Sequence, residues 1–113
     1  MDPYIFVAVK GIEMDEYNNL PKRSNVVKDN GFNPIFNFIV DITIACPELA
    51  FIVVKVFDKD VMQDDRLGIN ILSVLALRPG YRVLPLLDSS LNHIDNCYLF
   101  VHLQIIDLAN RLH

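Results

Sequence analysis

The clearest pattern along the chain is an alternation of apolar and polar side chains over residues 36–44. Apolar side chains occupy every even position of FNFIVDITI, and Asn37, Asp41 and Thr43 lie between them, with Ile39 as an exception. Successive side chains of a strand point to opposite faces of a sheet, so this period of two predicts a strand with one buried face.

Other short apolar stretches, separated by turn residues, predict further strands. They cover residues 3–10, 24–28, 51–58, 67–74, 81–87 and 97–106. Pro85 cannot donate to a ladder and indicates an edge or a strand end, and a polar loop is expected over 88–96. Short strands at this spacing, without a long amphipathic helix, predict an all-β fold, an antiparallel β-sandwich. Its predicted core comprises Phe36, Phe38, Val40, Ile42, Ile52, Val54, Val56, Leu99, Val101 and Leu103, with Cys97 and Ile105 also turned inward.

Composition restricts the class of protein. With 113 residues, 52% of them hydrophobic and 21% charged, the chain is expected to form one folded domain. Its apolar runs are far shorter than the ~20 residues of a membrane span, and no secretion signal is indicated. The net charge of -4 disfavours nucleic acid as a partner. Cys46 and Cys97 are expected to be reduced, half-buried thiols, although the sequence leaves a disulfide open.

Catalytic motifs are not found in the sequence. It contains no GxSxG, no glycine-rich phosphate loop and no HExxH. His93, His102 and His113 are expected to be solvated, and no serine or cysteine stands beside a histidine as an activated nucleophile would. The sequence therefore predicts no catalytic residue.

The most unusual stretch is acidic. Asp58, Asp60, Asp64 and Asp65 fall within eight positions at the end of a predicted strand, and two carboxylates ~4 Å apart repel by roughly 4 kcal/mol at an effective dielectric of ~20. Oxygen-only clusters suit calcium, but this is not an EF-hand loop: counted from Asp58, the sixth and twelfth positions hold glutamine and isoleucine rather than glycine and glutamate. A solvated acidic turn remains an alternative.

Five motifs, in this order and with matching intervals, resemble the C2 domain of eukaryotic phosphoinositide-specific phospholipase C. They are VVKDNGFNP (26–34), CPELAFIVVKVFDKD (46–60), RLGINIL (66–72), RPGYRVLPLLD (78–88) and LFVHLQI (99–105). The resemblance implies a C2-type Greek-key sandwich of eight strands, with residues 1–113 forming one C2 domain, a fragment of a larger phospholipase C chain. The chain begins at Met1-Asp2-Pro3, after the position of the family's first strand, so that strand is expected to be lacking.

The resemblance also implies a calcium site. Residue by residue, the family's ligand positions hold Asp2, Asp29, Asp58, Asp60 and Asp65. Asp64 is an extra acid beside the motif and is expected to be solvated, and the loop between Asp60 and Asp65 is about one residue shorter than in close relatives. Phe32 and Met62 are the apolar candidates for contact with lipid.

The implied function is calcium-dependent docking on an anionic phospholipid membrane. In the family, such docking brings a separate catalytic barrel to the membrane, where it hydrolyses phosphatidylinositol bisphosphate to diacylglycerol and inositol trisphosphate. The segment itself is expected to be non-catalytic, cytoplasmic and peripherally attached to the membrane. The alternative is a calcium-independent structural C2 module that braces the barrel.

Overall fold

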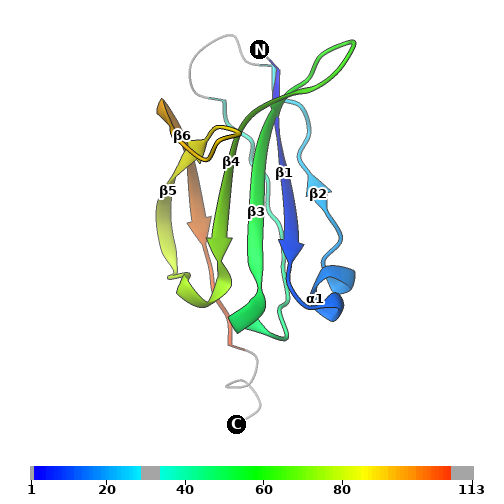
Figure 1. Cartoon of the computed structure of the whole chain (residues 1–113), viewed down its shortest axis with the longest axis vertical. Coiled ribbons are helices and arrows are strands. Elements are labelled where there is room, and N and C mark those ends of the chain that lie inside the picture. Colours follow the sequence, from blue (N-terminus) through cyan, green and yellow to red (C-terminus); the bar gives the residue numbers. More distant parts are fainter. Residues whose placement is uncertain (1, 29–33, 108–113) are drawn as a thin grey trace.

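The computed structural model describes residues 2–28 and 34–107. Within these ranges the strands are β1 (Pro3–Lys10), β2 (Lys22–Arg23), β3 (Phe51–Asp58), β4 (Asp65–Ser73), β5 (Gly80–Leu87) and β6 (His93–Leu103). The helices are α1 (Glu13–Asn18) and two 3-10 turns, Pro47–Leu49 and Val74–Ala76. The strands pair antiparallel in the order β2-β1-β3-β4-β5-β6 (Figure 1).

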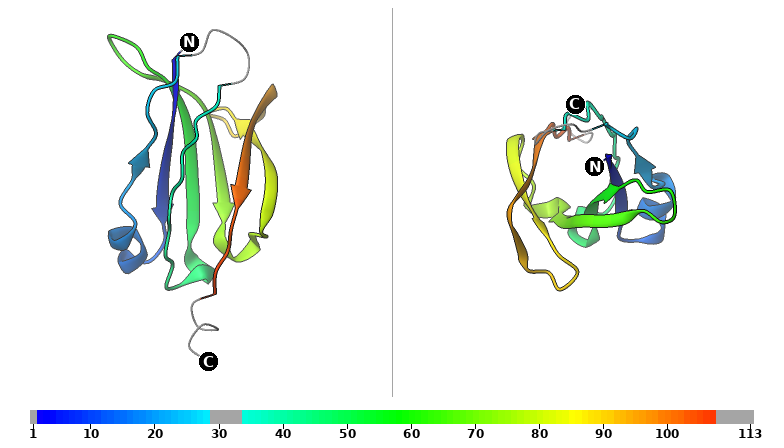
Figure 2. Two further views of the ribbon diagram at one scale, coloured as in Figure 1. Left: turned by 180° about the vertical axis from the view of Figure 1, so that it is seen from behind. Right: turned by 90° about the horizontal axis from the view of Figure 1, so that it is seen from above.

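The sheet folds over between β4 and β5, where Ile69↔Leu87 is the one register pair, whereas β3 and β4 pair along their length. Strands β2, β1, β3 and β4 therefore form one layer, and β5 and β6 turn across the core toward the extended segment 34–45 (Figure 2). Gly68 lies where the layers meet, because a Cβ there would come 2.7 Å from the Cβ of Leu86. The predicted antiparallel β-sandwich is confirmed.

The segment 34–45 keeps the predicted faces but is not a strand of the sheet. The side chains at even positions 36–44 are half-buried and those at odd positions are exposed, Ile39 at 87%. The prediction of a strand over 36–44 is nevertheless wrong, because the segment has no ladder partner among the described residues. Within residues 2–28 and 34–107, six strands therefore form where seven were predicted.

Side chains near α1 hold the end of this segment in place of a neighbouring strand. The Asn19 amide pairs with the main chain of Thr43, donating to its carbonyl at 2.8 Å and accepting from its N–H at 3.0 Å. The carboxylate of Asp15, which is 1% exposed, accepts from the N–H groups of Ala45 and Cys46 at 2.7 and 3.0 Å. Two polar side chains therefore satisfy main-chain groups that a strand would otherwise satisfy.

The predicted core is largely confirmed. Three of its ten members belong to the buried central cluster, namely Val54, Val56 and Leu99, and four more are partly buried and pack against it, namely Phe36, Phe38, Ile52 and Val101. Val40, Ile42 and Leu103 are half-buried outside it, and the sequence prediction missed the contributions of Ile5, Leu84 and Leu86. Cys97 packs against the cluster as predicted, whereas Ile105 lies beyond the end of β6 and is 50% exposed, so its inward placement is wrong.

Some predicted boundaries need correction. The predicted strand 24–28 is replaced by β2, which ends at Arg23. Directly after it, the Ser24 N–H donates to the Ile5 carbonyl at 2.8 Å, and the Ser24 hydroxyl oxygen accepts the Ile5 N–H at 2.9 Å. Strand β6 begins at His93, inside the predicted polar loop, where ladder pairing with Leu87 already starts. Pro85 lies within β5 rather than at its end, and its carbonyl accepts a bond of 2.7 Å from the Asn70 amide of β4.

The remaining sequence expectations concern single side chains and membrane crossing. Cys46 and Cys97 are free, half-buried thiols, as predicted. His93 and His102 are exposed, and His113 lies outside the described residues. No helix within residues 2–28 and 34–107 is long and apolar enough to cross a membrane.

Candidate functional site

Three of the predicted calcium ligands meet at one end of the sandwich. Asp2 precedes β1, Asp58 ends β3 and Asp65 begins β4, and the ladder places Pro3 opposite Asp58 and Asp58 opposite Asp65. The start of β1 and the connection 59–64, which we call the acidic loop, lie at the top of Figure 1, and α1 lies at the bottom. Asp60 belongs to the acidic loop, and the predicted ligand Asp29 lies outside the described residues.

The pairing of β3 with β4 sets two like charges side by side. Directly opposed residues of an antiparallel ladder have Cβ atoms roughly 4.5–5.5 Å apart, and like charges there are destabilising. Asp58 is half-buried and its Oδ1 accepts the Asp2 N–H at 2.9 Å, whereas Asp65 is exposed. Within the described residues neither carboxylate has an ion-pair partner.

Asp64 does not behave as predicted. Its Oδ2 accepts a 2.6 Å hydrogen bond from the Tyr4 hydroxyl, and its Oδ1 accepts the Asp60 N–H at 3.1 Å and lies 3.7 Å from Lys59 Nζ. The bond from Tyr4 is the main reason that the pKa of Asp64 is lowered, and the same bond raises the pKa of Tyr4. The expectation of a solvated Asp64 is therefore wrong, because a tyrosine 60 positions away in sequence binds it.

Tyr4 is itself held firmly. It is 6% exposed, its ring stacks on Phe57 with centroids 5.4 Å apart, and the guanidinium carbon of Arg23 lies 4.4 Å from the ring centroid. Three strands thus contribute to the support of Asp64, because Tyr4 belongs to β1, Arg23 to β2 and Phe57 to β3.

The donor chemistry of this end suits a hard cation, because it consists of carboxylate oxygens. The arrangement is incomplete over residues 2–28 and 34–107, where no three Asp, Glu, His or Cys side chains form a group that could hold a metal ion. Asp58 uses one oxygen for the Asp2 N–H, and Asp60 Oδ1 accepts only a long bond of 3.5 Å from the Met62 N–H. Asp2, Asp58 and Asp65 are neighbours in the fold, but the predicted ligands among the described residues do not form a closed cage.

Two side chains of the acidic loop are apolar and almost fully exposed. Met62, a predicted lipid contact, is 92% exposed, and the adjacent Val61, which the sequence prediction missed, is 98% exposed. Phe32, the other predicted lipid contact, lies outside the described residues. An apolar pair at the turn of a loop was visible in the sequence as VM between Asp60 and Gln63.

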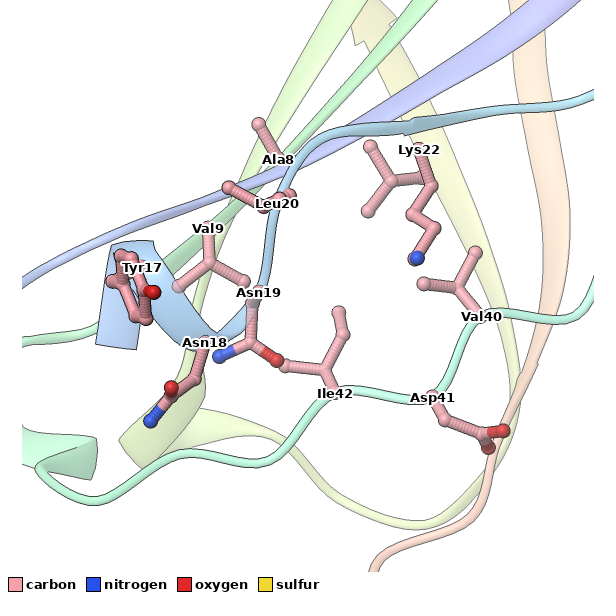
Figure 3. Close-up of a pocket in the computed structure, with 11 residues that line it drawn as sticks. Ala8, Val9, Tyr17, Asn18, Asn19, Leu20, Lys22, Val40, Asp41 and Ile42 are labelled. Atoms are coloured by element: carbon pink, nitrogen blue, oxygen red, sulfur yellow. The ribbon is translucent and has the colours of Figure 1, made fainter. Parts of the chain in front are cut away.

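A pocket of about 230 Å³ lies near α1 (Figure 3), at the opposite end of the sandwich from the acidic loop (Figure 1). Its walls come from β1, the chain after α1 and residues 40–42, including Val9, Val40 and Ile42. Lys22 and Asp41 are the lone charged residues among those that line it.

Comparison with known proteins identifies the family of the domain. A model of the C2 domain family matches residues 1–84. The human "Inactive phospholipase C-like protein 1" is 33% identical over 105 residues, which cover 93% of this chain and 9% of that protein. The mouse "1-phosphatidylinositol 4,5-bisphosphate phosphodiesterase eta-2" is 30% identical over 112 residues, covering 99% of this chain and 7% of that protein. The chain therefore spans less than a tenth of the length of these relatives.

The fold has a counterpart among solved structures. The crystal structure of S. officinalis PLC21 superposes with a TM-score of 0.76 at 20% sequence identity, covering 90% of this chain and 13% of that one. The family match is to a C2 domain, in agreement with the prediction that this segment is not itself catalytic. The chain belongs to the C2 domain family, and its relatives are proteins of the phospholipase C type, as the sequence motifs predicted.

Proposed function

We propose that this domain binds anionic phospholipid in a calcium-dependent manner and docks a larger phospholipase C on the membrane. The observation that carries the proposal is the opposition of Asp58 and Asp65 across β3 and β4. Two like charges facing each other weaken a ladder. A cation between them would turn that repulsion into a binding interaction, which explains why the pair is present.

Calcium would be held by Asp2, Asp58, Asp60 and Asp65, together with Asp29. Calcium takes six to eight oxygen ligands at ~2.3–2.6 Å, so bound calcium supplies positive charge at this end and coordination positions for lipid phosphate. The acidic loop by itself repels an anionic leaflet, and neutralising it allows the domain to approach.

Apolar contact with the membrane would be small. Val61 and Met62, at the exposed turn of the acidic loop, are placed to enter the interface, with Phe32 as the further candidate. Few apolar groups give weak and reversible attachment, because each buried methylene contributes only ~0.8 kcal/mol. The domain would therefore be cytoplasmic and attach peripherally when calcium rises.

The remainder of the proposed protein supplies the chemistry. Residues 1–113 would form the C2 domain of a longer chain whose separate catalytic barrel hydrolyses phosphatidylinositol bisphosphate to diacylglycerol and inositol trisphosphate. The mouse relative is named for a phosphodiesterase acting on phosphatidylinositol 4,5-bisphosphate, which supports this assignment. The barrel and the anionic membrane surface are then the two partners of the domain.

A second candidate function is a calcium-independent structural module that braces the barrel. Two observations favour it: protein groups already bind both oxygens of Asp64, and another relative is named an inactive phospholipase C-like protein. A loop set by its own hydrogen bonds needs no metal to be ordered.

Liposome co-sedimentation separates the two functions. We expect the chain to pellet with phosphatidylserine vesicles in calcium, to stay in solution with chelator or with phosphatidylcholine vesicles, and to be released by high salt because the attraction is screened. The Asp58→Asn/Asp60→Asn double variant should lose the calcium response. Asp41→Asn, at an exposed carboxylate outside the acidic loop, is the matched control and should keep it. Equal pelleting in calcium and chelator contradicts the proposal and leaves the structural module.

A further inference from the structure

Asp64 joins the two ends of the acidic loop. Its Oδ1 accepts the N–H of Asp60, four residues earlier, so the chain from Asp60 to Asp64 forms a closed turn. Lys59 Nζ, 3.7 Å from the same oxygen, places a positive charge beside it. Since Asp65 begins β4 directly afterwards, the position of Asp64 also sets where that strand starts.

The Tyr4 hydroxyl ties this closed turn to the sheet. The 2.6 Å bond to Asp64 Oδ2 comes from a ring that packing on Phe57 and Arg23 already fixes. Hydrogen bonds to charged acceptors are short and roughly twice as strong as neutral ones. The loop is therefore attached to a rigid part of the fold by a strong contact.

We propose that Asp64 is a positioning residue, which with Tyr4 holds the main chain of the acidic loop in one conformation and presets Asp60 for binding a cation. The inference rests on the proposed calcium-dependent function, and it goes beyond it because neither Tyr4 nor Asp64 is among the predicted ligands. The Asp60 carboxylate follows its main chain, and the Asp60 N–H is the group that Asp64 binds. A loop that is only partly in its competent form binds its ligand more weakly in proportion to that fraction.

Tyr4→Phe tests this role without changing any charge, because it removes the hydroxyl and keeps the stacked ring. Asp64→Asn would also remove a negative charge from the neighbourhood of the ligands, so it is the less clean variant. Tyr81→Phe is the matched control, because Tyr81 is 67% exposed and stacks on Phe100 of the other layer. All measurements use the full chain.

The first readout is amide hydrogen exchange of the metal-free protein by NMR. In Tyr4→Phe the Asp60 amide should exchange about tenfold faster, because a bond to a charged group contributes roughly that factor to an equilibrium. The Lys59 amide, which donates to the Asp2 carbonyl at 3.0 Å, should be unchanged and serves as an internal control. Unchanged exchange at Asp60 overturns the proposal.

The second readout is calorimetric titration with calcium. Tyr4→Phe should bind about tenfold more weakly than the wild type, equivalent to ~1.4 kcal/mol, and Tyr81→Phe should match the wild type. Faster exchange with unchanged affinity overturns the positioning role. Absence of calcium binding by the wild type overturns the proposed function, and the metal-free exchange result distinguishes that failure from a failure of the Tyr4–Asp64 contact.

Discussion

Removing one member of the opposed carboxylate pair should stabilise the domain in the absence of calcium. Asp65 lies directly opposite Asp58, and neither has an ion-pair partner within the described residues. Asp65→Asn keeps the size of the side chain and removes one of the two charges. Without metal, we expect the variant to be more stable than the wild type.

The magnitude follows from the spacing of the pair. At ~5 Å the repulsion is about 0.8 kcal/mol in water and about 3.3 kcal/mol at an effective dielectric of 20. Asp65 is exposed and Asp58 half-buried, so the lower limit is the better guide and we expect about 1 kcal/mol. In a domain of this size that gain raises Tm by roughly 4 °C.

Calcium should abolish the advantage of the variant. At a calcium concentration of 100 Kd, the wild type gains ~2.7 kcal/mol by mass action, and a tenfold weaker site loses ~1.4 kcal/mol of that gain. Urea unfolding of both proteins, in chelator and in excess calcium, measures the two differences directly. The wild type should therefore regain its stability relative to the variant only when calcium is present.

The control is Asp41→Asn, which removes an exposed carboxylate outside the acidic loop and should leave stability unchanged in both conditions. If Asp65→Asn is less stable than the wild type in chelator, the carboxylate makes a favourable contact and the repulsive pair is the wrong description. If calcium stabilises both proteins equally, Asp65 is not a ligand.

Three further predictions concern the fold. Phe38→Ala should cost roughly 2–3 kcal/mol in urea unfolding because the ring packs on the core, whereas Ile39→Ala, at a side chain that is 87% exposed, should cost almost nothing; equal costs would refute the register. Asp15→Ala should lower the free energy of unfolding by about 2–4 kcal/mol, because two N–H groups lose their acceptor, and Asp15→Asn, which keeps one oxygen, should lower it less. If Asp15→Ala leaves stability unchanged, the hydrogen bonds from Ala45 and Cys46 do not hold this segment. The pKa of Asp64 lies below its ordinary value of 3.8, so its contribution to stability is present above that pH and is lost as pH falls through the lowered pKa. Tyr4→Phe should therefore show a smaller loss of stability between neutral and acid pH, and identical pH profiles would show that the bond does not form.

Local periodicity predicted which side chains face the core, because the alternation of side chains is a property of one extended segment by itself. The alternation in 36–44 gave the correct buried and exposed positions of Phe38 and Ile39. Pairing depends instead on which chain lies alongside, and no periodic pattern contains that information. The most regular stretch of the sequence is therefore predicted as a strand, although it has no ladder partner among the described residues.

The parts of the site that sequence could not supply are contacts between distant residues. The motif placed Asp58 and Asp65 correctly at one end, because strand ends and family spacing determine their positions. The hydrogen-bond partner of Asp64 is Tyr4 on β1. Asp15, which binds the main chain of segment 34–45 and of Cys46, belongs to a helix of six residues, too short to show a helical period in the sequence. Both depend on the assembled tertiary structure.

The extended segment 34–45 has a consequence for the behaviour of the isolated chain in concentrated solution. Over residues 35–42, no main-chain hydrogen bond to another described residue is formed, and the side chains are aromatic or β-branched apart from Asn37 and Asp41. An unpaired apolar edge of this kind is a template for cross-β stacking between molecules, and natural proteins protect such edges with charge or cover. Residues 35–42, which also pack on the core, are therefore the segment through which we expect the chain to aggregate at high concentration. Covering their main chain would raise solubility without altering the core.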